Sequence, residues 1–133
     1  KKIMQSLTHN PVLGHITTFG GHPVSCTAGK TAMEVLLDKQ LVNDVQHKEN
    51  ILREKLHHPA IQKINAAGLW ASVHFDSFET CRKVVYKCIE NGVITDWLLF
   101  APQCLRIAPP LIISDEELNM ACDILLQSIE EAI

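Results

Sequence analysis

Apolar residues recur at helical spacing in four parts of the chain. The first part runs from about Pro23 to Lys39, where one helical face would carry Val24, Ala28, Ala32, Val35 and Leu36. The second runs from about Leu41 to His57, with an apolar seam of Leu41, Val45, Leu52 and Leu56. The polar positions of this second segment predict a solvated face made of Asn43, Asp44, Gln46, Lys48, Glu49, Arg53 and Glu54. We expect two long helices here.

Two further helices are marked by their ends as well as by their spacing. The segment from Phe78 to Asn91 is helical in pattern, Gly92 suits its C-terminal cap, and the expected inward residues are Phe78, Cys81, Val85 and Cys88. Ser114-Asp115-Glu116-Glu117 is a capping box, in which serine and the glutamate three residues later satisfy each other's backbone N–H groups. The helix that follows would bury Leu118, Cys122, Leu125, Ile129 and Ala132.

Strand patterns fill the interval between these helices. Leu69 to Phe75 alternates as a half-buried strand does, and the other candidates are Val93–Thr95, Leu98–Phe100 and Cys104–Ile107. Ala101-Pro102-Gln103 is the expected hairpin turn, while Pro59 and Gly68 bracket a predicted turn or short helix. The order predicts an α+β fold, in which two long helices lead into a small, mostly antiparallel sheet covered by helices.

Composition narrows the class of protein. With 133 residues, of which 47% are apolar, the chain is long enough for one domain with a proper core. A net charge of −3 gives no reason to expect nucleic acid or an anionic membrane as a partner. No apolar run approaches the roughly 20 residues of a membrane span. The five cysteines contain no CxxC pair, so we expect reduced thiols and a cytoplasmic protein.

The beginning of the chain lacks a helix cap and an initiator methionine. Lys1 to Leu7 has the pattern of a helix already under way, and Thr8 to Gly14 has loop composition. We therefore expect a piece of a longer chain, with part of any active site outside this sequence.

The segment Thr17-Thr18-Phe19-Gly20-Gly21-His22-Pro23 is the first candidate site. Its glycines permit positive φ and close backbone approach, and proline suits the first position of a helix. A helix start also offers free N–H groups and the positive end of the helix dipole. Together with the two threonine hydroxyls, these groups predict a seat for a phosphate.

Arg106, in Leu105-Arg106-Ile107-Ala108-Pro109-Pro110, is a second polar anchor, because a guanidinium binds a planar carboxylate through two parallel hydrogen bonds. From the residues alone, simpler interpretations stay open: Thr18 could belong to a capped turn, and Arg106 could be a surface residue of a strand. Cys104 is expected to be buried in that strand. The seven histidines show no metal-ligand spacing, so we expect no metal site.

The order of TTFGGHP, a long helix, AGLW, ENGVITD and LRIAPPLIISDEEL resembles the C-terminal portion of class III aminotransferases. These are pyridoxal-phosphate enzymes of the acetylornithine, succinylornithine and ornithine aminotransferase group, and the likeness covers essentially the whole chain. The resemblance assigns Thr18 to the cofactor phosphate of the neighbouring subunit, with Thr17 as a structural residue or second contact. It assigns Arg106 to the α-carboxylate of the substrate.

The resemblance also implies an organisation and an activity. Residues 1–40 would be the end of the large cofactor-binding domain with its long connecting helix, and residues 41–133 the C-terminal small α+β domain of a fold-type I enzyme. The full-length homodimer would transfer an amino group from an amino acid, such as an ornithine derivative, to a 2-oxo acid such as 2-oxoglutarate. The alternative is a non-catalytic module that binds a small anion or another protein.

This chain departs from the family pattern in three respects. His22 stands where the family usually has asparagine, and Asn65-Ala66-Ala67-Gly68 replaces an Arg-Gly-x-Gly run in a predicted turn distant from the chemistry. The family's Schiff-base lysine lies upstream of TFGG, and the lysines present here all fall on predicted helices or their edges. A cofactor-bearing lysine needs a desolvated amine with a lowered pKa, so we expect this segment alone to be inactive.

Overall fold

The computed structural model describes residues 2–7 and 17–133, and the chain divides into two compact units, residues 1–39 and 40–133. The predicted loop Thr8–Gly14 lies outside the described residues, as do His9 and His15. None of the helices in the described part combines the length and the apolar character that crossing a bilayer would need.

The first unit contains a short 3₁₀ helix, η1 (Met4–Leu7), and the predicted long helix, α1 (Pro23–Asp38). Pro23 occupies the first turn of α1, where its missing N–H costs no hydrogen bond. No residue of α1 is buried, so the predicted apolar face of this helix is exposed in the unit except at Leu36, which is half-buried.

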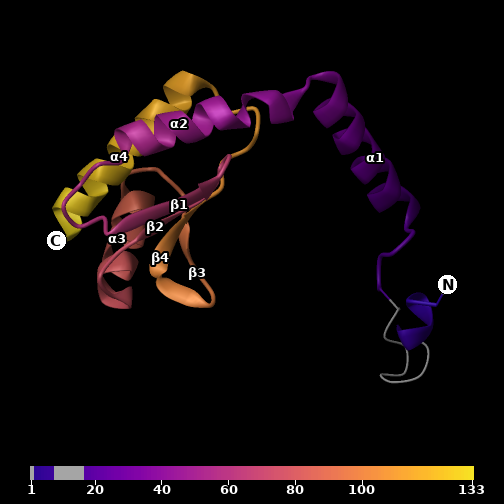
Figure 1. Cartoon of the computed structure of the whole chain (residues 1–133), viewed down its shortest axis with the longest axis horizontal. Coiled ribbons are helices and arrows are strands. Elements are labelled where there is room, and N and C mark those ends of the chain that lie inside the picture. Colours follow the sequence, from indigo (N-terminus) through magenta and orange to yellow (C-terminus); the bar gives the residue numbers. More distant parts are fainter. Residues whose placement is uncertain (1, 8–16) are drawn as a thin grey trace. The chain divides into compact units, whose positions relative to one another are not determined.

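The second unit is a four-stranded antiparallel sheet with helices on one face (Figure 1). The strands follow the order β1-β2-β4-β3, with bounds β1 (Lys63–Ala67), β2 (Trp70–His74), β3 (Asp96–Leu98) and β4 (Ala101–Ile107). The helical elements are η2 (Leu41–Asp44), α2 (Val45–Lys55), α3 (Phe78–Glu90) and α4 (Asp115–Ala132). The predicted α+β fold with a small helix-covered antiparallel sheet is confirmed.

The core lies between the sheet and its helices. Val73 and Leu105 are cross-strand partners on β2 and β4, and both are buried under the helices. The helices contribute Leu52, Cys81, Val84, Val85, Cys88, Leu118, Cys122, Leu125 and Ile129 to the same cluster, and Leu56, directly after α2, joins them. Phe78, which we expected inside, is 40% exposed, and Val84 is buried instead. One face of the sheet is thus occupied by packing, and the other is left for polar groups.

The capping interactions predicted at the start of α4 and at the end of α3 are both formed. Ser114 and Glu117 make both hydrogen bonds of the capping box at the start of α4. At the end of α3, Gly92 has φ of 95°, and the N–H groups of Gly92 and Val93 donate to the carbonyls of Ile89 and Cys88. This is the Schellman pattern, which glycine favours because it adopts positive φ without steric cost.

Three local predictions about the sheet were wrong. Lys63–Ala67 is a strand, not a turn or short helix, because it pairs residue by residue with β2. Val93–Thr95 lies outside the strands, and β3 begins at Asp96. The tight turn between β3 and β4 falls at Leu99 and Phe100 instead of at Ala101–Gln103, which belongs to β4.

The expected solvated face of the second helix was also partly wrong. Lys48 and Glu49 are buried, at 6% and 8% exposure. Lys48 Nζ donates to the carbonyl of Leu111 at 3.1 Å and pairs with Asp44 at 3.0 Å. A charged group can be buried when hydrogen bonds or an opposite charge compensate for the water that it loses.

Candidate functional site

The predicted anion seat forms a tight turn in front of α1. The N–H of Gly20 donates to the carbonyl of Thr17 at 3.4 Å, and that of His22 donates to Phe19 at 3.1 Å. Gly21 has φ of 80°, a conformation that glycine adopts far more readily than other residues. The sequence of small and hydroxyl residues therefore folds the chain back just before the helix begins.

The two threonines of this turn have different surroundings. A Cβ at position 20 would overlap the Oγ1 atom of Thr17, so the Thr17 hydroxyl is packed against the backbone of Gly20. Thr18 is exposed, and nothing in the described part of the turn encloses it. Both threonines are exposed, but the Thr17 hydroxyl lies against Gly20, so Thr18 is the hydroxyl better placed for a ligand.

The start of α1 has unused donors. His22, at the N-cap, makes no side-chain hydrogen bond to the helix, and the first turn contains no acidic residue. The first N–H groups of a helix have no partner within the helix, and they carry the positive end of its dipole. An uncapped helix start beside an exposed hydroxyl can accept a phosphate.

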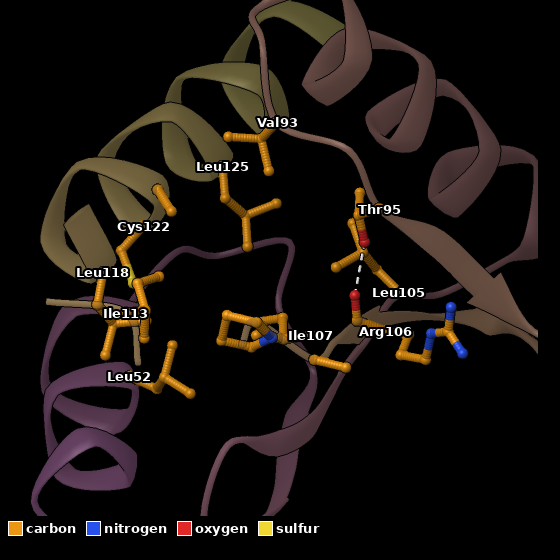
Figure 2. A pocket seen from close by; sticks show the side chains of 13 residues that line it. Leu52, Val93, Thr95, Leu105, Arg106, Ile107, Ile113, Leu118, Cys122 and Leu125 are labelled. Carbon is orange, nitrogen blue, oxygen red and sulfur yellow. Dashed lines mark hydrogen bonds between the residues drawn. The ribbon is translucent and has the colours of Figure 1, made fainter. Parts of the chain in front are cut away.

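Arg106 lies on β4 and projects away from the helices. Its backbone carbonyl accepts a hydrogen bond from Thr95 Oγ1 at 2.5 Å. Figure 2 shows this bond beside an apolar cavity of about 90 Å³, whose lining includes Leu52, Leu118 and Leu125. The guanidinium of Arg106 points out of that cavity (Figure 2), so the charge faces the side of the sheet that the helices leave open.

The guanidinium of Arg106 has two partners. Its Nη2 donates to Oδ2 of Asp96 at 2.8 Å, and its carbon lies 5.9 Å from the ring centroid of Trp70. The Arg106 side chain is 41% exposed, so it remains accessible to a third group. The sequence pattern indicates Arg106 as an anchor, but it predicts no contact between Arg106 and either partner.

His74 is the centre of a neighbouring polar cluster on the same face. Its Nε2 lies 2.9 Å from Asn65 Nδ2 and 3.2 Å from Ser72 Oγ, and its Nδ1 lies 3.3 Å from Cys104 Sγ. This cluster is not among the sequence-based predictions, which place Asn65 in a turn distant from the chemistry. The alternation of residues 69–75 did contain a signal, since it places Ser72 and His74 on one face.

Cys104 is buried, as expected from the sequence. Burial raises the pKa of its thiol, because removal from water disfavours the charged thiolate. Since the thiolate is the nucleophilic form, Cys104 is a packing residue with a hydrogen bond to His74, not a reactive group.

A cofactor could be held by a lysine or through a metal ion. In the described ranges, no three residues of the types His, Cys, Asp and Glu are grouped closely enough to hold a metal ion. Lys48 is the one buried lysine of the described chain, and its ammonium is bonded to Leu111 and Asp44. Lys63, which we expected on a helix or its edge, lies on β1.

The expected site residues fall in both units. Thr17 and Thr18 belong to the first unit, and Arg106 belongs to the second. The first unit offers hydroxyl and N–H donors for an anion, and the second offers a guanidinium for a carboxylate.

Comparison with known proteins gives a consistent result. The chain matches the family Aminotransferase class-III over residues 1–129. An acetylornithine aminotransferase of Haemophilus ducreyi is 36% identical over 118 residues, which cover 88% of this chain and 29% of that protein. An ornithine aminotransferase 2 of Staphylococcus saprophyticus is 32% identical over 112 residues, covering 82% of this chain and 27% of that protein.

Solved structures share the fold. The ornithine aminotransferase of Toxoplasma gondii, whose active site was found with partial occupancy of PLP, superposes with a TM-score of 0.75 at 29% identity, over 99% of this chain and 32% of that chain. This chain therefore spans less than a third of the length of these relatives. Because the family match extends over nearly all of its residues, the chain belongs to the class III aminotransferase family.

Proposed function

We propose that the complete polypeptide carrying this chain is a pyridoxal-phosphate-dependent aminotransferase. It transfers an amino group from an amino acid, of which ornithine and its acylated derivatives are the first candidates, to a 2-oxo acid such as 2-oxoglutarate. Family membership supports the reaction type, and the names of the relatives support the donor class. The single observation that carries the proposal is the accessible guanidinium of Arg106 on the open face of the sheet in this family context.

The turn before α1 fits the phosphate of the cofactor. Thr18 would donate its hydroxyl, and the uncapped N–H groups of the first turn of α1 would donate alongside it. Thr17 would support this seat by holding the turn against Gly20. When bound, the cofactor supplies the electron sink through which the amino group passes.

Arg106 would bind the α-carboxylate of the substrate. A guanidinium fork fixes both the position and the rotation of a carboxylate, because it makes two parallel hydrogen bonds. Holding the carboxylate at one end orients the amine at the other, which is how an enzyme uses binding energy to align a reacting group.

Several wider features belong to the same proposal. Residues 1–40 are the end of the large cofactor-binding domain and its connecting helix, and residues 41–133 are the small α+β domain. The enzyme works in the cytoplasm. It is a homodimer, because the family resemblance implies that Thr18 binds the cofactor phosphate of the neighbouring subunit. The chain alone is inactive, because its buried Lys48 is already bonded to acceptors.

The test is steady-state kinetics on the complete polypeptide, with ornithine or N-acetylornithine as donor and 2-oxoglutarate as acceptor. Arg106→Ala is expected to raise KM for the carboxylate substrates by about 10–100-fold, since hydrogen bonds to charged groups contribute about 1.5–3 kcal/mol. Arg82→Ala is the matched control, because Arg82 pairs with Glu79 on the surface of α3.

Two results would contradict the proposal. One is a wild-type polypeptide that forms no amino-acid product with either donor under conditions that saturate the cofactor. The other concerns this chain by itself: a borohydride-stable lysine adduct with pyridoxal phosphate, found by mass spectrometry, would show that it does supply an attachment lysine.

A further inference from the structure

Arg106 has a cross-strand neighbour on each of the two adjacent strands. The strand register places Ser72 of β2 on one side and Asp96 of β3 on the other. Nη2 of Arg106 donates to Asp96 Oδ2 at 2.8 Å, whereas the described contacts of Arg106 include no hydrogen bond to Ser72. Arg106 thus has an anionic partner on the β3 side and a neutral neighbour on the β2 side.

Trp70 gives the guanidinium a second support. The guanidinium carbon lies 5.9 Å from the centroid of the Trp70 ring, within the range of a cation–π contact. Trp70 is 63% exposed, so most of this large ring is outside the core. Asp96 and Trp70 together hold the orientation of an otherwise flexible side chain.

The geometry of the guanidinium leaves room for another carboxylate. A carboxylate binds arginine through one of two forks, Nη1 with Nη2 or Nε with Nη2, and each fork uses a different hydrogen of Nη2. Asp96 takes one hydrogen of Nη2. Whichever hydrogen that is, one complete fork stays available. In the described part of the chain, Nε and Nη1 of Arg106 donate to no acceptor.

Asp96 contacts Arg106 through one oxygen only. Its second oxygen, Oδ1, is buried and has no hydrogen-bond partner among the described residues. An ion pair that served stability alone would gain from a second parallel hydrogen bond, and a buried oxygen without a donor costs free energy. The one-point contact is therefore poor as a stabilising pair, but it is the arrangement that keeps a fork open.

We propose that Asp96 is a positioning residue for the carboxylate of the substrate. It stays hydrogen-bonded to Arg106 while the substrate carboxylate occupies the open fork, and Trp70 supports the guanidinium from the β2 side. This inference rests on the proposed function, in which Arg106 receives that carboxylate. The ligand is the carboxylate of either substrate, the amino donor or the 2-oxo acid.

Asp96 has two opposite effects on such a ligand. Its charge repels a second carboxylate, whereas its hydrogen bond orders the arginine before the ligand arrives. The side chains of Arg106 and Asp96 are 41% and 50% exposed, so water and salt screen the repulsion. Ordering a long side chain at the moment of binding carries an entropic cost that prior ordering removes. We therefore expect the ordering effect to dominate.

The experiment is a kinetic comparison of variants in the complete, cofactor-loaded polypeptide. Asp96→Ala should raise KM for the carboxylate substrates about 3–10-fold, with kcat within about 2-fold of wild type, because ordering of the arginine is lost but the reacting groups are not touched. Asp96→Asn should keep KM within about 2-fold of wild type, because its amide oxygen still accepts from Nη2. Asp123→Ala, which breaks an exposed 2.8 Å ion pair with Lys55, is the control and should change neither constant.

A second measurement addresses the persistence of the contact and does not depend on the alanine variant folding. A crystal structure of the complete polypeptide with succinate bound at Arg106 should retain the hydrogen bond between Nη2 and Asp96 Oδ2. Trp70→Leu should raise KM in the same direction as Asp96→Ala, since it removes the other support of the guanidinium.

The outcomes separate this inference from the function on which it rests. An Arg106→Ala variant with unchanged KM would overturn the proposed function and this inference together. A raised KM in Arg106→Ala with no change or a decrease in Asp96→Ala would overturn the positioning role alone. The positioning role would also be overturned if Asp96→Asn raised KM as much as Asp96→Ala does, or if the hydrogen bond between Asp96 and Nη2 broke when succinate bound.

Discussion

Glu49 accepts the backbone N–H of Gly68 at 2.6 Å, which ties the second long helix to the turn between the first two strands. The other oxygen of Glu49 accepts from Arg53 Nε at 2.8 Å, and Arg53 also donates to the carbonyls of Ile64 and Ala66 on β1. A buried carboxylate thus joins α2 to β1 through its own bonds and those of Arg53. This attachment fixes the edge of the sheet that carries Asn65 and, through β2, Trp70.

The first prediction concerns the pH dependence of this link. The hydrogen bonds from Arg53 and then from Gly68 lower the pKa of Glu49 below its ordinary value of 4.5. Because the folded carboxylate binds a proton less readily than the unfolded one, its stabilising effect is present above pH 4.5 and is lost as the pH falls through the folded pKa.

Glu49→Gln should therefore be less stable than wild type at neutral pH, and the difference should shrink as the pH falls below 4.5 and the wild-type carboxylate takes up a proton. Urea unfolding at a series of pH values measures this. Glu54→Gln, at an exposed position of α2, is the control. A stability difference for Glu49→Gln that stays constant over the pH range would show that the carboxylate charge is not what matters.

The second prediction compares two glycines in the left-handed region. Gly68 has φ of 62°, and an added Cβ would lie 3.1 Å from the side chain of Val45, whereas Gly92 has φ of 95° and nothing within 4 Å. In both alanine variants, backbone strain should lower the free energy of unfolding by about 1–2 kcal/mol. The decrease should be larger for Gly68→Ala, because its methyl group is also crowded against Val45.

A double-mutant cycle tests the part of that crowding that comes from Val45 Cγ2, since alanine at position 45 keeps the Cβ atom. Val45→Ala should recover part of the loss in Gly68→Ala and none of the loss in Gly92→Ala, as measured by the free energy of unfolding in urea. Equal losses in the two glycine variants, with no recovery by Val45→Ala, would mean that the turn moves to accommodate the methyl group.

The third prediction tests the anion seat in the complete polypeptide. Thr18→Ala should weaken binding of pyridoxal phosphate by about 10-fold or more, since a hydroxyl bonded to a charged phosphate contributes about 1.5–3 kcal/mol. Thr18→Ser should restore binding because it keeps the hydroxyl. Fluorescence titration of the apoenzyme gives the dissociation constant. Thr27→Ala, which removes a hydroxyl bonded to the Pro23 carbonyl, is the control. Unchanged affinity in Thr18→Ala would remove Thr18 from the site.

The fourth prediction concerns the thiols. Burial raises the pKa of Cys81 to about 12 and that of Cys122 to about 11, from an ordinary value of 9.0. We expect iodoacetamide to modify the exposed Cys26 in the native protein, and to modify Cys81 and Cys122 only after unfolding. Mass spectrometry of the labelled peptides distinguishes the sites. Labelling of Cys81 at the rate of Cys26 would contradict the burial.

The raised thiol pKa values have a consequence for stability. Above pH 9 the unfolded chain releases the Cys81 proton more readily than the folded chain, so the stabilising effect that is complete below pH 9 declines towards pH 12. Cys81→Ala should reduce this alkaline loss of stability, although it also removes buried atoms.

Local signals in the sequence were sufficient for the helices and for the class of fold. Pro23 before an apolar stripe, the Ser114–Glu117 capping box and the Asn91-Gly92 pair each specify a helix end through atoms within a few residues. Such interactions can be read from the order of residues alone, because the chain brings the partners together without help from the rest of the fold. Thr18 and Arg106 stood out for the same reason, since their neighbours form short recognisable motifs.

Pairings between distant segments were decided by the tertiary structure. Lys63–Ala67 lacks β-branched residues apart from Ile64, and it becomes a strand because β2 supplies hydrogen-bond partners along its length. Lys48 and Glu49 carry charges that predict exposure, yet they are buried because Leu111 and Gly68 offer them partners. The contact of Arg106 with Asp96 and Trp70 likewise depends on the register of β2, β3 and β4. Sequence order does not contain this register, because it is set by packing of the whole sheet against its helices.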